Sequence, residues 1–240
     1  MATPSRRDTP GALTGQAEDY LKVIYHLERS GEAAATSDIA AELGVAPASV
    51  SGMLQRLARL GLVRVERYRG ARLAPPGRHV ALQLIRRHRI IESFLATKLG
   101  YSWDDVHDEA ERLEHAASTE LIERMAESLG HPTADPHGAP IPTAEGRVDE
   151  RSLRSIAEMA VRETARVVRM SDRDPVFLRY LAGVGLTPGV EVTVVAIAPF
   201  DGPVELRIAR KRVSIGAAAA GRVFIEPVGT GTPRRPGLAK

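Results

Sequence analysis

The segment that decides the fold is ATSDIAAELGVAPASVSGMLQRLARLGLV, residues 35–63. Its first part predicts a short helix that starts at an N-cap, Thr36 or Ser37, and ends at Gly44. A second helix is expected to begin near Pro47 and to end at Gly61. Two short helices joined by a glycine turn predict a helix-turn-helix, in which the second helix enters the major groove of DNA.

The flanking segments complete a winged helix. Apolar residues recur at three- and four-residue spacing from Ala17 to Leu27, which predicts a preceding helix. After the core segment, LVRVERYRGARLAPPG (residues 62–77) alternates apolar and polar residues around Arg69-Gly70, which predicts a β-hairpin. Three helices followed by a hairpin are the order of a winged helix-turn-helix.

The predicted second helix has small or polar residues on its exposed face, so its backbone can approach DNA bases closely. Six arginines lie at the end of this helix and along the following hairpin, and the same stretch has a single acid, Glu66. The arginines are Arg56, Arg59, Arg64, Arg67, Arg69 and Arg72. This row of arginines is typical of a surface that neutralises the phosphates of DNA. The alternative is a basic face that binds another protein. The residues expected to contact DNA are Ser37, Pro47, Ala48, Ser49, Ser51, Gln55, Arg56 and Arg69.

The composition limits which classes of protein remain possible. A chain of 240 residues can hold one large domain or a few small ones. It has no cysteine, which excludes disulfides and leaves only nitrogen and oxygen ligands for a metal. No apolar run reaches the roughly 20 residues of a membrane span, and the N-terminus lacks the apolar region of a signal peptide. We therefore expect a cytoplasmic protein.

The whole pattern predicts a mainly α protein with a small β domain. Residues 77–129 read as two or three helices whose apolar surface favours a homodimer interface, and short alternating strands follow from Ala165. The expected parts are a disordered tail at 1–15, a winged helix-turn-helix DNA-binding domain at 16–76, a helical dimerisation and metal-binding domain at 77–146, a linker at 147–163, an SH3-like β-barrel at 164–229 and a disordered tail at 230–240.

One charged stretch, VHDEAERLEH at residues 106–115, is either a solvated helix face or part of a metal site. Helical geometry places His107, Glu111, Glu114 and His115 on one face, and His88 and Glu92 form a further i, i+4 pair on the preceding helix. Spacing alone leaves both interpretations open. The HExxH and di-iron patterns are absent, and no nucleophile site is indicated, so we expect no enzyme.

Several segments in this order resemble the diphtheria toxin repressor (DtxR) family of metal-dependent transcriptional regulators, and above all its manganese-responsive MntR branch. The resemblance covers residues 17–228. It is carried by EDYLKVIYHLE (18–28), the helix-turn-helix, RYRGARL (67–73), RRHRIIESFL (86–95), VHDEAERLEH, DPHGAPIP (135–142) and FLRYLAGVGLTPGVEV (177–192), the last of these resembling the FeoA-type SH3-like domain.

The resemblance implies two metal sites per subunit. The first would use Asp19, Glu111, Glu114 and His115, and the second His88, Glu92 and His107, with Asp174 from the C-terminal domain. Iron-responsive members place Met and Cys where this chain has Asp19 and Glu111, so Mn²⁺ is the expected ion and Fe²⁺ the alternative.

Two departures from the family pattern affect the expected sites. Lys22 stands where small two-domain manganese sensors have Glu, and Phe177 replaces a Gln ligand of the iron branch. We therefore expect two separate sites and no binuclear cluster. Asp174 is either a ligand or the N-cap of the helix that leads to Phe177, and His137 is expected to be structural or exposed.

The resulting hypothesis is a metal-dependent repressor of metal-homeostasis genes that binds double-stranded operator DNA as a homodimer. Metal and operator would strengthen each other's binding. The alternative is a winged-helix regulator that senses a small organic ligand, which would require an apolar pocket. Metal storage or enzymatic turnover fits the recognition helix and its arginines less well.

Overall fold

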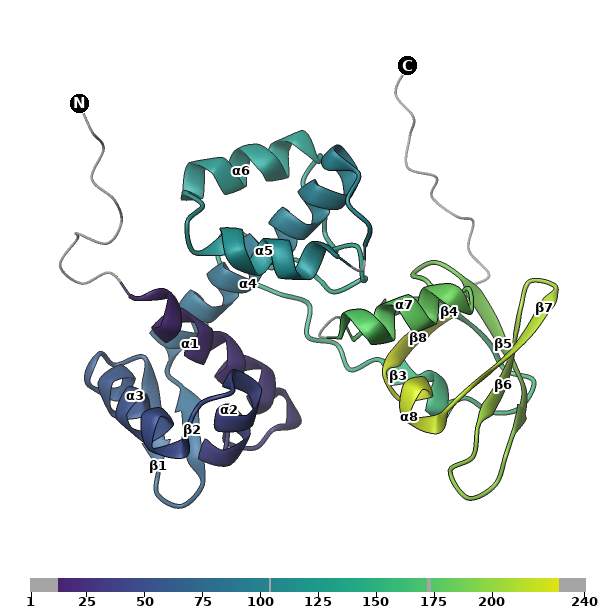
Figure 1. Ribbon diagram of the computed structural model, residues 1–240, viewed down its shortest axis with the longest axis horizontal. Helices are drawn as coiled ribbons and strands as arrows, with labels where there is room; N and C mark the ends of the chain where they lie inside the picture. Colours follow the sequence, from purple (N-terminus) through teal and green to yellow (C-terminus); the bar gives the residue numbers. More distant parts are fainter. Residues whose placement is uncertain (1–12, 104, 172–173, 229–240) are drawn as a thin grey trace. The chain divides into compact units, whose positions relative to one another are not determined.

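The computed structural model of the 240-residue chain describes residues 13–103, 105–171 and 174–228 (Figure 1). These residues form two compact units. The first contains the described residues up to Leu99 together with 108–133 and 140–149, and the second contains 100–107, 134–139 and the described residues from Glu150 onward. Within the described ranges, no helix combines the length and the apolar character of a membrane span.

The first unit begins with a winged helix-turn-helix, which confirms the predicted order of elements. The N-cap of the second helix is Ala35, without a side-chain hydrogen bond, so the expected Thr36 or Ser37 cap was wrong. Thr14 caps the first helix by accepting a hydrogen bond from the Ala17 amide at 3.3 Å. Gly44 ends the second helix in the left-handed region at φ 62°. The elements are α1 (Gly15–Leu27), η2 (Glu28–Ser30), α2 (Thr36–Leu43), α3 (Pro47–Arg59), β1 (Val63–Glu66) and β2 (Gly70–Leu73).

The winged-helix core is formed by the apolar residues whose spacing predicted the helices. Tyr20, Leu21 and Ile24 of α1 meet Ile39 of α2 and Leu57 of α3, and all five are almost fully buried. Gly77 follows the wing at a close approach, because a Cβ added there would lie 1.9 Å from the Leu62 carbonyl oxygen. The close contact between Gly77 and Leu62 holds the start of the next helix against the residue that precedes β1.

Three further helices complete the first unit's α-helical part: α4 (Pro75–Leu99), α5 (Val106–Glu114) and α6 (Thr119–Ser128). Most of the apolar surface expected for a dimer interface is buried within the single chain, namely Leu82, Leu84, Ile85, Ile90, Ile91 and Leu95. These residues are therefore needed by the chain's own core. The exposed leucines of this region are Leu99, Leu113 and Leu121.

The second unit is a small antiparallel sheet with short helices. Its elements are β3 (Arg154–Ser155), η3 (Ile156–Glu158), β4 (Thr164–Met170), α7 (Pro175–Gly183), β5 (Glu191–Ile197), β6 (Val204–Ile208), β7 (Lys211–Ile215), α8 (Ala217–Ala220) and β8 (Val223–Pro227). The strand order is β3-β8-β4-β5-β6-β7. Among the described residues β3 and β7 are edges, so the expected closed barrel is an open sheet. Alternating residues predict strands, but closure depends on pairing between the edge strands, which the alternation does not encode.

Two segments outside the predicted strands also belong to this unit. Ile156 and Met159, within the expected linker, are buried in its core. In the segment 134–139, Asp135 accepts hydrogen bonds from the amides of His137 and Ala139, and the His137 carbonyl accepts from the Met170 amide of β4. The His137 ring is buried and donates to the Trp103 carbonyl at 2.7 Å.

Candidate metal centre and DNA-binding surface

A group of potential metal ligands forms where α1 meets the end of α5. One ligand atom each from Asp19, Glu114 and His115 lies within 4.8 Å of the others. His115 Nε2 is 3.0 Å from Asp19 Oδ1 and 3.5 Å from Glu114 Oε1. The His115 ring packs over Gly15, where an added Cβ would be only 3.3 Å from its Cγ. The first turn of α1 therefore leaves space for this imidazole.

Glu18 fixes the orientation of the same imidazole. Its Oε2 lies 2.8 Å from His115 Nδ1, and the Glu18 side chain is only 11% exposed. Because a carboxylate can only accept, Nδ1 carries the proton in this contact. Nε2 then faces Asp19 and Glu114, and on metal binding it would give up its proton and offer its lone pair there, which is the arrangement that metal-binding histidines use. Sequence reasoning missed Glu18, since an acid beside Asp19 in the first turn of a helix has no distinctive spacing.

Glu114 is the centre of the arrangement and is only 1% exposed. Its Oε2 accepts from His88 Nδ1 at 2.6 Å, and its Oε1 accepts from Lys22 Nζ at 2.7 Å. Burial raises the pKa of Glu114, but the hydrogen bond from His88 and the positive charges of His88 and Lys22 outweigh it and lower the pKa to about 2. Glu114 is therefore a carboxylate at neutral pH. For Asp19, burial is the larger effect and raises the pKa.

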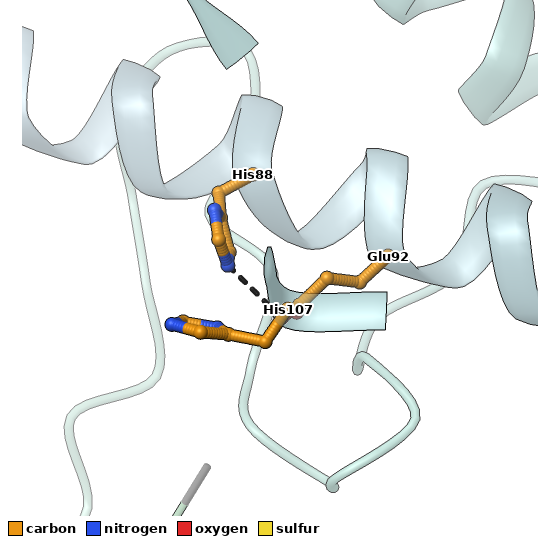
Figure 2. A group of neighbouring side chains, drawn as sticks. All are labelled: His88, Glu92 and His107. Carbon is orange, nitrogen blue, oxygen red and sulfur yellow. Dashed lines mark hydrogen bonds and ion pairs between the residues drawn. The ribbon is translucent and has the colours of Figure 1, made fainter. Parts of the chain in front are cut away.

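A second group consists of His88, Glu92 and His107, whose ligand atoms also lie within 4.8 Å of one another (Figure 2). His88 and Glu92 are one turn apart on α4, with His88 Nε2 2.9 Å from Glu92 Oε1. His107 is in the first turn of α5, the helix that ends at Glu114. Burial lowers the pKa of His88, but Glu92 and the contact with Glu114 raise it to about 10.

Glu111 lies beside other donors than the resemblance implied, and Asp174 has a local structural role. Glu111 is half exposed and contacts Lys22 at 3.0 Å, and it forms a ligand group with His88 and Glu114 instead of with Asp19. Asp174 caps α7, accepting from the amides of Val176 and Phe177. The N-cap interpretation of Asp174 is therefore confirmed. Within the described ranges, no ligand group includes Asp174.

The donors at both groups suit a hard or borderline divalent cation. They are carboxylate oxygens and imidazole nitrogens, the types that bind Mn²⁺, Fe²⁺ and Zn²⁺. Ligand distances of about 2.0–2.4 Å place the donors of one ion roughly 3–4.5 Å apart, and both groups are close to this spacing. Asp19, Glu114 and Glu92 bring three carboxylates to the two groups, and Glu92 is fully buried, so an added cation would offset concentrated negative charge.

The expected DNA-contacting residues are all exposed on α2, α3 and the wing. Ser51 donates to the Pro47 carbonyl at 3.2 Å, so its hydroxyl lies along the start of α3. Arg72 pairs with Glu66 at 3.0 Å, which neutralises the one acid of the hairpin strands. Arg67 stacks on the ring of Tyr68, which is 91% exposed at the tip of the wing. Two other wing arginines, Arg64 and Arg69, are also exposed.

Comparison with known proteins agrees with a DNA-binding winged helix and with a metal-binding helical region. Residues 12–71 match the family model "Iron dependent repressor, N-terminal DNA binding domain", residues 74–143 match "Iron dependent repressor, metal binding and dimerisation domain", and residues 154–227 match the FeoA domain. The iron-dependent repressor IdeR of Mycobacterium tuberculosis is 34% identical over 194 residues, which cover 76% of this chain and 84% of the relative.

Other relatives and solved structures extend the comparison. The diphtheria toxin repressor of Corynebacterium diphtheriae is 37% identical over 130 residues, covering 54% of this chain and 58% of the relative. A manganese-dependent transcriptional repressor in complex with manganese has a TM-score of 0.81 and 38% identity, covering 88% of this chain and all of that one. The structure of IdeR from T. acidophilum has a TM-score of 0.73 and 30% identity, covering 90% of this chain and 99% of that one.

A winged helix beside clustered histidines and carboxylates defines a metal-dependent DNA-binding regulator, and not an enzyme. The chain belongs to the DtxR/MntR family of metal-dependent transcriptional regulators. It is a metal-dependent repressor with a C-terminal FeoA domain, and regulation by an organic ligand is not favoured.

Proposed function

We propose that Mn²⁺ is the activating ion of this repressor and that Asp19, Glu114 and His115 hold it at the regulatory site. The main support is that Asp19 lies beside Glu114 and His115. Asp19 is on a helix of the DNA-binding domain, and the other two residues are at the end of α5 in the metal-binding domain. A ligand group shared between the two domains can make the placement of the recognition helix depend on metal. His88, Glu92 and His107 are proposed as a second, separate site.

The choice of Mn²⁺ rests on the donors. Asp19, Glu114 and His115 supply hard oxygen and imidazole ligands without sulfur. The manganese complex named above is consistent with this choice, whereas the mycobacterial relatives are named iron-dependent repressors. Fe²⁺ is therefore the second candidate, since it uses the same ligand types.

The chain's own residues carry the switch. Without a bound ion, the Asp19 and Glu114 side chains lie at the junction of α1 and α5, where His115 contacts both of them and Lys22 contacts Glu114. A divalent ion held there would neutralise both carboxylates and fix α1 against α5. In a homodimer, the position of α1 sets the spacing of the two recognition helices, α3, which must match half-sites about one helical turn apart. A coupling of about 1–3 kcal/mol is typical for such linkage.

The arrangement of domains and the site of action follow from the same proposal. We assign DNA binding to residues 16–76, metal binding and dimerisation to 77–146 and the SH3-like domain to 164–229, with the chain acting on operator DNA in the cytoplasm. Ser37, Pro47, Ala48, Ser49, Ser51, Gln55, Arg56 and Arg69 are proposed to face that DNA. Exposed Leu99, Leu113 and Leu121 are candidates for the dimer contact.

The test is an Asp19→Ala variant with Glu120→Ala as matched control, because Glu120 is a 74% exposed acid that pairs only at the surface with Arg124. Removal of one ligand should weaken Mn²⁺ binding by at least about 100-fold, since loss of an outer partner alone costs 10- to 100-fold. Calorimetric titration with Mn²⁺ and operator binding at a fixed Mn²⁺ concentration measure this change. Wild-type affinity and Mn²⁺ response in Asp19→Ala would contradict the assignment.

A further inference from the structure

A tight turn joins β5 and β6 in the second unit (Figure 1). The Gly202 amide donates to the Pro199 carbonyl at 3.2 Å, and the two residues between them, Phe200 and Asp201, are both left-handed, at φ 58° and 54°. Such turns favour Gly, Asn or Asp at both central positions, because a bulky side chain is strained there. Phe200 is nevertheless 99% exposed, so packing within the described chain does not offset this strain.

A groove lies beside this turn, at the same end of the sheet. It has a volume of about 380 Å³, and its apolar lining includes Ile197, Pro203 and Val213. Ile197 is 44% exposed and directly follows the β-bulge of β5, a feature that redirects the side chains of a strand. Arg212 and Glu205 are the charged residues of the lining. Because a cavity of roughly 150 Å³ already holds a benzene molecule, the groove has room for a phenyl ring.

We propose that the Phe200 ring of one copy enters this groove on a second copy of the chain, so that two second units pair. Because the turn and the groove lie at the same end of one unit, a two-fold axis lets each copy receive the other's ring, and the contact closes on itself. The charges are complementary. Asp201, next to the ring, is exposed, and Arg212 at the groove is 69% exposed and contacts Glu205 at 3.5 Å.

This pairing is weak by itself and depends on the helical domain. An aromatic side chain buries about 150–250 Å², so two exchanged rings cover far less than the roughly 1,000 Å² of an independent interface. Residues 74–143 match a metal-binding and dimerisation domain, which would hold two second units near each other. The high local concentration that such tethering gives allows a weak contact to form. The contact would join the two FeoA domains of a homodimer, a role separate from metal and DNA binding.

The experiment uses introduced thiols, because the chain has no cysteine of its own. Two full-length chains with different affinity tags are co-expressed, one with Asp201→Cys and the other with Ser214→Cys, a residue of the groove lining. Mild oxidation is followed by non-reducing electrophoresis and mass spectrometry, which measure disulfides between the two chains. In the matched control, Val176→Cys replaces Ser214→Cys, because Val176 is 67% exposed on α7 and outside the groove lining.

We expect the disulfide between positions 201 and 214 to form at least about tenfold faster than that between 201 and 176. Phe200→Gly in both chains should reduce the faster rate to that of the control, since loss of a buried aromatic anchor typically weakens an interface more than tenfold. Glycine suits the left-handed turn, so this variant tests the ring without straining the fold. Phe200→Tyr should keep the faster rate. Equal rates for the two pairs, or no effect of Phe200→Gly, would overturn the proposal and leave the groove to another occupant.

Discussion

Replacing Glu114 by Gln tests the electrostatic centre of the first unit. The substitution keeps the shape of the side chain but removes the charge that faces Lys22 Nζ at 2.7 Å and His88 Nδ1 at 2.6 Å. Because the group is 1% exposed, solvent cannot replace these partners. We expect a large loss of stability in the metal-free protein, since two buried cations lose a shared partner.

The size of the loss follows from the pKa of Glu114, which falls from 4.5 to about 2 despite the opposing effect of burial. At 1.36 kcal/mol per unit, this corresponds to roughly 3 kcal/mol of unfolding free energy. A lowered carboxyl pKa stabilises the folded state above about pH 4.5, and this contribution is lost as the pH falls toward 2. The raised pKa of His88 reflects the same contact, so it is not added again.

Urea unfolding in EDTA at pH 7 measures the change. Helical circular dichroism follows mainly the first unit, whereas fluorescence of Trp103, the single tryptophan, follows the second unit, whose core it contacts. Glu114→Gln should shift the first transition by about 3 kcal/mol and leave the second unchanged. The control Glu120→Gln, at a surface pair, should change either by less than about 0.5 kcal/mol. A Glu114→Gln value as small as the control's would show that Glu114 is not the charge that stabilises Lys22 and His88.

Three further outcomes are expected. Glu18→Gln should weaken Mn²⁺ binding about tenfold, because a neutral amide oxygen is a weaker acceptor for His115 Nδ1 than a carboxylate; full Mn²⁺ affinity in calorimetry would argue against this orienting role. Gly77→Ala should destabilise the first unit by about 1–3 kcal/mol in urea unfolding, because its Cβ would meet the Leu62 carbonyl at 1.9 Å, and an unchanged midpoint would contradict this close approach. Arg69→Ala should lower the slope of log K against log salt for operator binding by about 1, and an unchanged slope would exclude a phosphate contact.

The sequence predicts most of the winged helix because local signals determine it. Gly44 and Pro47 mark helix boundaries that the structure contains, and the hairpin turn at residues 67–69 ends at Gly70, beside the expected Arg69-Gly70. Closure of the C-terminal sheet was wrongly predicted, because it depends on the pairing of distant edge strands. Likewise, Ile156 and Met159 appear in a polar stretch whose burial depends on tertiary contacts.

The candidate site was predictable in part. Helical spacing correctly groups His88 with Glu92, and the family resemblance pairs Asp19 with Glu114 and His115. Neither the spacing nor the resemblance tells how side chains of two adjacent helices are positioned relative to one another in this chain. The contact of Glu18 with His115 and the insertion of Lys22 between two glutamates depend on how α1 packs beside α5, which only the three-dimensional structure gives.

Control of DNA binding by Mn²⁺ is tested most directly on the metal dependence of operator binding. Duplexes selected from a random-sequence library in the presence of Mn²⁺ provide the operator, and fluorescence anisotropy then compares binding in EDTA, Mn²⁺, Fe²⁺ and Zn²⁺. We predict specific binding in Mn²⁺ that is lost in EDTA and restored when Mn²⁺ is added back. Binding of equal affinity with and without chelator would contradict control of DNA binding by Mn²⁺.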